Sequence, residues 1–195
     1  MSAVLDKLAM SPPARGREEI LGRLFELFRE TGYAGASMSD IARVTGLKAP
    51  SLYHHFPGGK AEMAEAVADS AADALGATVL AALDAPGERS ERIGAMLDAV
   101  RELYENGRRP CVSASLMLGP TPDAVSRATG RLVRRWIDRL AGALVETGAG
   151  PEAARRAATD AIARIQGSLI VARALGDPTS FQEALDAVEP ALSGT

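Results

Sequence analysis

The sequence predicts an all-α protein of about nine helices. Apolar residues recur at helical spacing in one segment after another, and no stretch alternates apolar and polar residues as a half-buried strand would. Hydrophobic residues make up 47% of the chain and aromatic residues only 4%, so the core must consist mainly of Ala, Leu, Val and Ile side chains. Such small aliphatic side chains suit closely packed helices.

The expected elements follow from the positions of glycine and proline, which end helices. Residues 1–13 are expected to form a flexible arm. Helices are then expected over residues 15–31, 38–45, 49–56, 60–83, 90–106, 110–118, 121–147, 151–176 and 180–192. We therefore divide the chain into the arm (1–13), an N-terminal three-helix domain (14–59) and a helical C-terminal domain (60–195).

Each expected helix carries one apolar face. The inward positions of the longer helices are Ile20, Leu21, Leu24, Phe25, Leu27 and Phe28; then Met63, Val67, Ala71, Ala74 and Leu75; then Ile93, Met96, Leu97, Val100, Leu103 and Tyr104; then Val125, Leu132, Val133, Trp136, Ile137, Leu140 and Leu144; and finally Leu185, Val188 and Leu192. The expected core of the N-terminal domain is Phe25, Phe28, Ile41, Leu47, Leu52 and Phe56. The last helix also places Ser180 and Glu183 at the spacing of a capping box.

Two short helical patterns lie on either side of Gly46, and they form the most informative part of the chain. Ser37 occupies the expected N-cap of the first, with Asp40 at capping-box spacing. Gly46 supplies the positive φ that ends this helix, and the second begins near Ala49. Two short helices joined by a glycine-containing turn predict a helix-turn-helix, whose second helix enters the DNA major groove.

The stretch from Gly32 to Lys60 resembles the DNA-binding domain of the TetR family of bacterial transcriptional repressors. The matching pieces are Leu24-Phe25-Glu26-Leu27-Phe28, Gly32-Tyr33, Ser37-Met38-Ser39-Asp40-Ile41-Ala42, Thr45-Gly46-Leu47, Ser51-Leu52-Tyr53-His54-His55-Phe56 and Lys60. The segment around Cys111, which follows an Arg-Pro step and precedes a helix of small residues, resembles the subgroup that contains the LmrA-type drug-resistance repressors. The resemblance implies a repressor that binds double-stranded operator DNA and responds to a small-molecule effector.

The expected DNA contacts lie on the two short helices and at the start of the next helix. The predicted DNA-binding residues are Ser37, Ser39, Lys48, Ala49, Pro50, Ser51, Tyr53, His54 and Lys60. The resemblance implies phosphate contacts for the Tyr53 hydroxyl and for Lys60. Lys48 can donate to guanine O6 and N7, which carries roughly 1–3 kcal/mol of discrimination. The family commonly has Ser-Lys-Gly where Lys48-Ala49-Pro50 stand, so the operator cannot be transferred from relatives.

The resemblance also implies an effector pocket between helices of the C-terminal domain. Its expected lining is Met63, Val67, Met96, Val100, Tyr104, Cys111, Ser115, Met117, Trp136, Ile137, Leu140, Gln166 and Ile170. Any one of these side chains is more simply explained as plain core, and only the set argues for a cavity. Because few charges are within reach, we expect a mostly apolar effector, oriented by Ser115 and Gln166.

The last two helices resemble the family's dimer face. The expected interface consists of Ala154, Ala158, Ala161, Ile165, Leu169, Ala172, Leu185, Val188 and Leu192. A two-fold homodimer would place two recognition helices roughly 34–36 Å apart, on a near-palindromic operator. Effector binding would move the helix at residues 60–83 and release the protein from DNA.

Several other functions find no support. The chain lacks GxSxG, P-loop, GxGxxG and HExxH motifs, so we expect no enzyme. Adjacent His54 and His55 make a poor chelate, and neither a metal nor a cofactor is expected. Asp6 and Lys7 interrupt the apolar residues at the start of the sequence, so we expect no secretory segment there, and we see no apolar run that suits a membrane span. We therefore expect a cytoplasmic protein without a membrane partner. Two alternatives stay open, namely redox sensing through Cys111 and an orphan helical interaction protein without ligand response.

Overall fold

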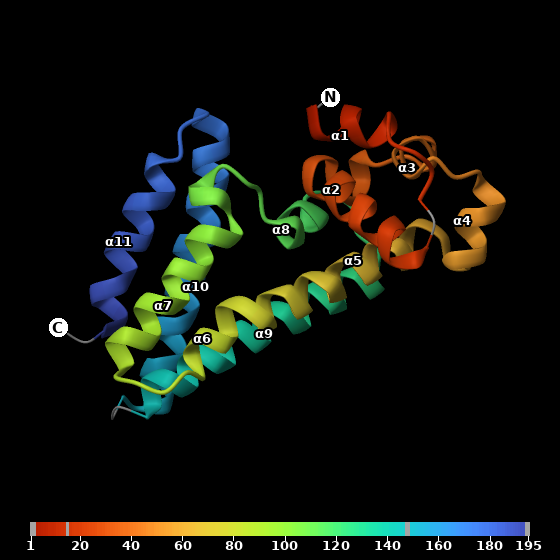
Figure 1. The fold of residues 1–195 in the computed structure, drawn as a ribbon. Helices are drawn as coiled ribbons and strands as arrows, with labels where there is room; N and C mark the ends of the chain where they lie inside the picture. The colour runs from red at the N-terminus through yellow and green to blue at the C-terminus, as the bar shows by residue number, and fades with distance from the viewer. Residues whose placement is uncertain (1–2, 15, 147–148, 194–195) are drawn as a thin grey trace. The chain divides into compact units, whose positions relative to one another are not determined.

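The computed structural model describes residues 3–14, 16–146 and 149–193, and every regular element in these ranges is helical (Figure 1). The elements are α1 (Ala3–Ala9), α2 (Arg17–Gly35), α3 (Met38–Thr45), α4 (Ala49–His55), α5 (Gly59–Leu75), the π-helical η1 (Gly76–Leu80), α6 (Ala81–Leu83), α7 (Arg89–Leu103), the 3₁₀ turn η2 (Glu105–Gly107), α8 (Val112–Met117), α9 (Asp123–Val145), α10 (Pro151–Leu175) and α11 (Thr179–Ser193). The predicted all-α class is confirmed. The predicted helix ends at residues 15 and 147 lie outside the described residues.

The chain forms two compact units, and each draws on two separate segments. We call Met1–Ala72 with Val112–Leu132 the head unit, and Asp73–Cys111 with Val133–Thr195 the body unit. This division differs from the boundary expected at residues 59–60, because α5 up to Ala72, α8 and the first part of α9 belong to the head unit. Sequence periodicity cannot reveal that a later segment returns to pack on an earlier one.

The head unit is built around α2. Phe28 lies on α2, Ile41 on α3, Leu52 in the middle of α4 and Phe56 at the C-cap of α4, and all four are fully buried. Each such side chain contributes about 1.5–3 kcal/mol by leaving water. Four of the six expected core positions are therefore buried, whereas the other two, Phe25 and Leu47, are only partly buried.

The expected flexible arm is wrong for the described residues 3–14. Residues Ala3–Ala9 form helix α1, and Leu5 is 2% exposed. Its contacts lie mainly on α3. The following segment is tied down as well, because the buried Arg23 donates a 2.7 Å hydrogen bond to the carbonyl oxygen of Pro12. A short apolar pattern before two prolines was too weak a signal to predict this helix.

The helical geometry of α2 breaks at Gly32, where the sequence predicts a helix end, and the helix resumes beyond this kink up to Gly35. Gly32 has φ 69° and lies against α8, so a Cβ atom at this position would stand 2.6 Å from the carbonyl oxygen of Ser115. The Ser115 hydroxyl donates a 2.8 Å hydrogen bond to the carbonyl oxygen of Arg29, one turn earlier in α2. Close approach of two backbones and a positive φ both require glycine here.

The body unit contains α7, the second part of α9, and the α10–α11 hairpin. Trp136 and Phe181 are fully buried in it, and the ring of Tyr104 meets that of Phe181 edge to face at 6.1 Å between centroids.

The predicted capping box of Ser180 and Glu183 is wrong. Helix α11 begins at Thr179, whose backbone N–H and hydroxyl both donate to Asp177, and the Ser180 hydroxyl donates to the carbonyl oxygen of Ser168 instead.

The helical run from Gly59 to Leu83 is long and apolar enough, by length and composition, to cross a membrane. One such helix is weak evidence, because core helices of soluble proteins pass the same test. Four positions of the predicted inner face, Met63, Val67, Ala71 and Leu75, are buried, but Ala74 is exposed, so its assignment to that face is wrong.

Candidate functional site

The helix-turn-helix begins at a complete capping box. The Ser37 hydroxyl accepts a 3.0 Å hydrogen bond from the Asp40 backbone N–H, while the Ser37 backbone N–H and hydroxyl both donate to the Asp40 carboxylate. Arg43 also donates a 2.9 Å hydrogen bond to this carboxylate. The hydrogen bonds that Asp40 accepts, from the Ser37 hydroxyl first and then from Arg43, lower its pKa from 3.8 to about 2. At the other end, Gly46 takes φ 71° and its N–H donates to Ala42, as predicted.

Replacing Ser37 with Ala is expected to lower the free energy of unfolding of the head by about 0.5–2 kcal/mol at pH 7. Because Asp40 has a lowered pKa, its contribution is present above pH 3.8 and is lost as the pH falls toward 2. The difference between the wild type and the variant should therefore shrink between these pH values. Urea unfolding across this range measures it, with Ser39→Ala, an exposed neighbour, as control. An equal effect of both substitutions would contradict the capping role.

Helix α4 presents one face to solvent and one to the head core. Leu52 points inward, whereas Lys48, Ala49, Pro50, Ser51 and His54 are all exposed. Lys48 takes an extended conformation at the N-cap, and its side chain makes no capping hydrogen bond. The absent N–H of Pro50 costs nothing here, because the first N–H groups of a helix have no helical partner. The outward face of α4 is therefore available to a groove, as the sequence predicts.

Tyr53 and Lys60 both make contacts within the head. The Tyr53 ring packs against Gly59 at the start of α5, yet the residue is 48% exposed. The Lys60 ammonium donates to the carbonyl oxygens of Tyr33 and Ala36 at 2.9 and 2.8 Å and lies 4.2 Å from the Tyr33 ring centroid. Lys60 thus fastens α5 to the end of α2, a role that the sequence did not indicate, and its phosphate contact stays a prediction.

Two arginines of α2, which contact the ends of α3 and α4, were not predicted from the sequence. Arg23 is buried and donates to the carbonyl oxygens of Val44 and Thr45 at the end of α3. Arg17 contacts the end of α4 through His55 and Phe56. Their position in the first turns of a helix with an otherwise apolar face gave no signal, because charged residues there usually face solvent.

The residues of the predicted effector pocket divide between the two units. In the head, Met63, Val67 and Ser115 are buried, but Met117 is 42% exposed and does not line an enclosed space. In the body, Met96, Val100, Tyr104, Trp136 and Leu140 are buried and Ile137 is half-buried. Ile170 is 54% exposed because it lies on the outer face of α10, so its assignment to the pocket is wrong.

A polar chain crosses the body unit at three of these positions. Gln166 Nε2 donates to the Tyr104 hydroxyl at 3.3 Å, and this hydroxyl donates to Cys111 Sγ at 3.5 Å. Within the described part of the chain, Gln166 Oε1 and the indole N–H of Trp136 are buried without a hydrogen-bond partner. A buried polar atom without a partner costs about 1–3 kcal/mol, so these two atoms are places where a ligand could gain free energy.

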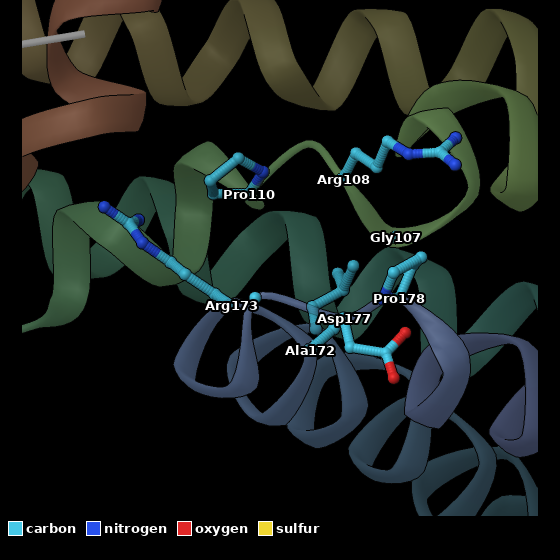
Figure 2. A pocket seen from close by; sticks show the side chains of 9 residues that line it. Gly107, Arg108, Pro110, Ala172, Arg173, Asp177 and Pro178 are labelled. Carbon is cyan, nitrogen blue, oxygen red and sulfur yellow. The ribbon is translucent and has the colours of Figure 1, made fainter.

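A different pocket of about 260 Å³ lies in the body unit beside the α10–α11 turn (Figure 2). Gly107, Arg108 and Pro110 form one side, and the other side consists of Leu169, Ala172, Arg173, Gly176, Asp177 and Pro178. Figure 2 shows the side chains of Arg108 and Arg173 extending in opposite directions. The two guanidinium groups therefore do not converge on a common anion.

The predicted dimer interface is wrong in its residues. All nine positions, Ala154, Ala158, Ala161, Ile165, Leu169, Ala172, Leu185, Val188 and Leu192, are between 0% and 4% exposed in the single subunit. These side chains join α10 and α11 to the core of the body unit, so a second subunit cannot reach them. The small residues allow close helix approach inside the subunit, which the sequence pattern alone cannot distinguish from approach between subunits.

The opposite face of α10 carries an exposed apolar stripe that the sequence alone did not indicate. Ile170, Val171 and Leu175 are 54%, 46% and 71% exposed. Ala163 and Ala174 are exposed at positions that continue the stripe at helical spacing. We call these five residues the α10 stripe. The helical spacing of these residues predicts the stripe only once it is known that the other face of α10 is buried.

Two sequence families match this chain. The model of the bacterial regulatory proteins, tetR family, matches residues 20–67, which contain α3 and α4. The model of the transcriptional regulator LmrA/YxaF-like C-terminal domain matches residues 90–187, about half of the chain. The two matches fall on the helix-turn-helix and on the C-terminal helices.

Individual proteins agree with these matches over most of the chain. The HTH-type transcriptional regulator LmrA of Bacillus subtilis is 26% identical over 161 residues, covering 80% of this chain and 85% of LmrA. A TetR transcriptional regulator of Legionella pneumophila superposes with a TM-score of 0.79 at 25% identity, covering 92% of this chain and 98% of that structure. A cysteine mutant of the TetR-family regulator CifR, complexed with 26-bp operator DNA, has a TM-score of 0.74 at 22% identity, with coverage of 94% and 98%.

Proposed function

Because this chain belongs to the TetR family of bacterial transcriptional regulators and carries an LmrA/YxaF-like C-terminal domain, we propose that it is a cytoplasmic repressor released from DNA by a small-molecule effector. The observation that carries the proposal is the solvent-exposed face of α4, which projects from a capped and fully packed helix-turn-helix. Its relatives are transcriptional regulators and not enzymes.

We propose that the protein binds a near-palindromic operator as a homodimer. The operator complex of CifR, which shares the fold, supports DNA as the partner. The α10 stripe supports pairing with a second copy, since Leu175 and its neighbours expose apolar side chains that water would otherwise contact. A two-fold pair is self-complementary and would present two α4 helices to successive major grooves.

The effector that we propose is mostly apolar, with at least one hydrogen-bonding group. Buried Met96 and Val100 supply apolar surface in the body unit. Gln166 Oε1 and the Trp136 indole N–H supply an acceptor and a donor that lack partners within the described residues. A coupling of about 1–3 kcal/mol between effector and DNA binding would change operator affinity roughly 5- to 150-fold.

Selection from a random duplex library tests the proposal. The wild-type protein should enrich a two-fold symmetric sequence, and gel shifts with the gene's own upstream region should show the same preference. Compounds that quench or shift the fluorescence of the single tryptophan, Trp136, should weaken this binding. Failure to enrich any duplex would refute DNA recognition, whereas enrichment without a response to any such compound would favour a regulator without an effector.

Replacing Lys48 with Ala is expected to relax the selected consensus at one base pair in each half-site. The Lys48 ammonium lies at the exposed N-terminal end of α4, where it can donate to a guanine edge. The preference at that base pair should fall roughly 5- to 150-fold, which corresponds to 1–3 kcal/mol. Library selection with the variant measures this, and Tyr53→Phe, which removes the exposed hydroxyl predicted to contact a phosphate, serves as the control that should weaken all sequences alike. An unchanged consensus would show that Lys48 does not read a base.

A further inference from the structure

Helix α4 has only seven residues, from Ala49 to His55, and its two ends are held differently. So short a helix is marginal in water on its own, so its pose depends on tertiary contacts. Leu52 anchors its middle in the head core. At its N-terminal end no side chain caps the backbone, which leaves the C-terminal end as the place where further fixation can occur.

Arg17, in the first turn of α2, contacts this C-terminal end. Its guanidinium donates to the backbone carbonyl oxygen of His55, one of the last carbonyl groups of α4, and lies 4.1 Å from the centroid of the Phe56 ring. The last carbonyl groups of a helix have no helical partner and carry partial negative charge, which favours a cation. The planar guanidinium can bind this oxygen and cover the aromatic face together.

The turn between α4 and α5 is held by the same cluster. Glu62 Oε1 lies 3.8 Å from Arg17 Nη2, while Glu62 Oε2 accepts a 2.7 Å hydrogen bond from the backbone N–H of Gly58. Arg17 and Glu62 therefore bracket the residues from His55 to Gly58 from α2 and from α5. Arg17 is itself exposed, its side chain at 51%, so the contacts do not arise from simple burial in the core.

We infer that Arg17 is a positioning residue for DNA recognition, which sets the orientation of α4 through His55 and Phe56 without itself binding DNA. This inference rests on the proposed DNA binding. An exposed arginine in a DNA-binding head has an obvious alternative role as a phosphate contact. The two roles differ in a measurable way, because only a phosphate contact releases counterions.

The experiment compares the wild type, Arg17→Ala and Arg17→Lys on a duplex selected from a random library by the wild-type protein. Lys7→Ala is the matched control, since it removes an exposed positive charge from α1 of the same unit. Arg17→Ala should weaken binding about 10-fold, the loss expected for one charge-assisted hydrogen bond. The slope of log K against log salt concentration should equal that of the wild type. A slope smaller in magnitude by about 0.9 would assign Arg17 to a phosphate and overturn the inference.

Hydrogen exchange in the protein without DNA provides the second readout. The amides of Phe56 and Gly59, which donate to Leu52 and Phe56, should exchange faster in Arg17→Ala, while those of Ile41 in α3 should not change. Arg17→Lys, which keeps the charge but lacks the planar fork, should show an intermediate loss of affinity and an unchanged salt slope. Unchanged exchange at Phe56 and Gly59 would overturn the inference. If the wild type selects no duplex, the proposed function fails, while the exchange result still tests the contact.

Discussion

Substitution of Ile170 by Asp is expected to produce a folded monomer that binds the operator at least about 100-fold more weakly than the wild type. Ile170 is 54% exposed near the middle of the α10 stripe, so a carboxylate there is hydrated in the monomer but would be buried in a dimer. Burying a charge without a partner is strongly unfavourable. Loss of the dimer removes the second reading helix, and two linked binding events typically gain 10²–10⁴-fold over one.

Sedimentation velocity and fluorescence titration with the selected duplex measure the two consequences together. Ala95→Asp, an exposed position on α7, introduces the same charge elsewhere in the body unit and should leave both mass and affinity unchanged. An Ile170→Asp variant that stays dimeric would exclude the α10 stripe as the interface. A monomer with full affinity would instead mean that one reading helix suffices.

Replacing Gly32 with Ala is expected to lower the free energy of unfolding of the head by about 2–5 kcal/mol. The backbone at Gly32 has φ 69°, where a residue with a Cβ atom costs about 1–2 kcal/mol. The new methyl group would also stand 2.6 Å from the Ser115 carbonyl oxygen, so α8 would have to move. Displacement of α8 would in turn break the hydrogen bond from Ser115 to Arg29.

Gly22 offers a control in the same helix with the opposite expected sign. It lies within α2, is exposed, and a Cβ atom there would meet nothing within 4 Å. Gly22→Ala should therefore stabilise the helix by about 0.5–1 kcal/mol. Urea denaturation of the three proteins gives both values. Equal effects of the two substitutions would show that the kink at Gly32 is not a constraint.

The sequence predicted the local structure of the helix-turn-helix well, because capping residues and apolar spacing act over a few residues. Ser37, Asp40 and Gly46 form the cap and stop that their spacing indicates, and α3 begins and ends where expected. Leu52 and Phe56 are buried as a helical period requires. In each case the determining interactions join residues a few positions apart, so the spacing of residue types along the sequence is enough to predict them.

The sequence by itself thus determined the all-α class, the helix-turn-helix, the family, and the outward face of α4. Tertiary structure alone decided which face of α10 is buried, since Ile165 and Ile170 are equally apolar, yet Ile165 is fully buried and Ile170 is 54% exposed. It also decided that α8 packs at Gly32 and that Arg17 contacts the end of α4. These contacts join residues that are distant in the sequence. The apolar periodicity of one helix does not indicate which other helix its faces will pack against.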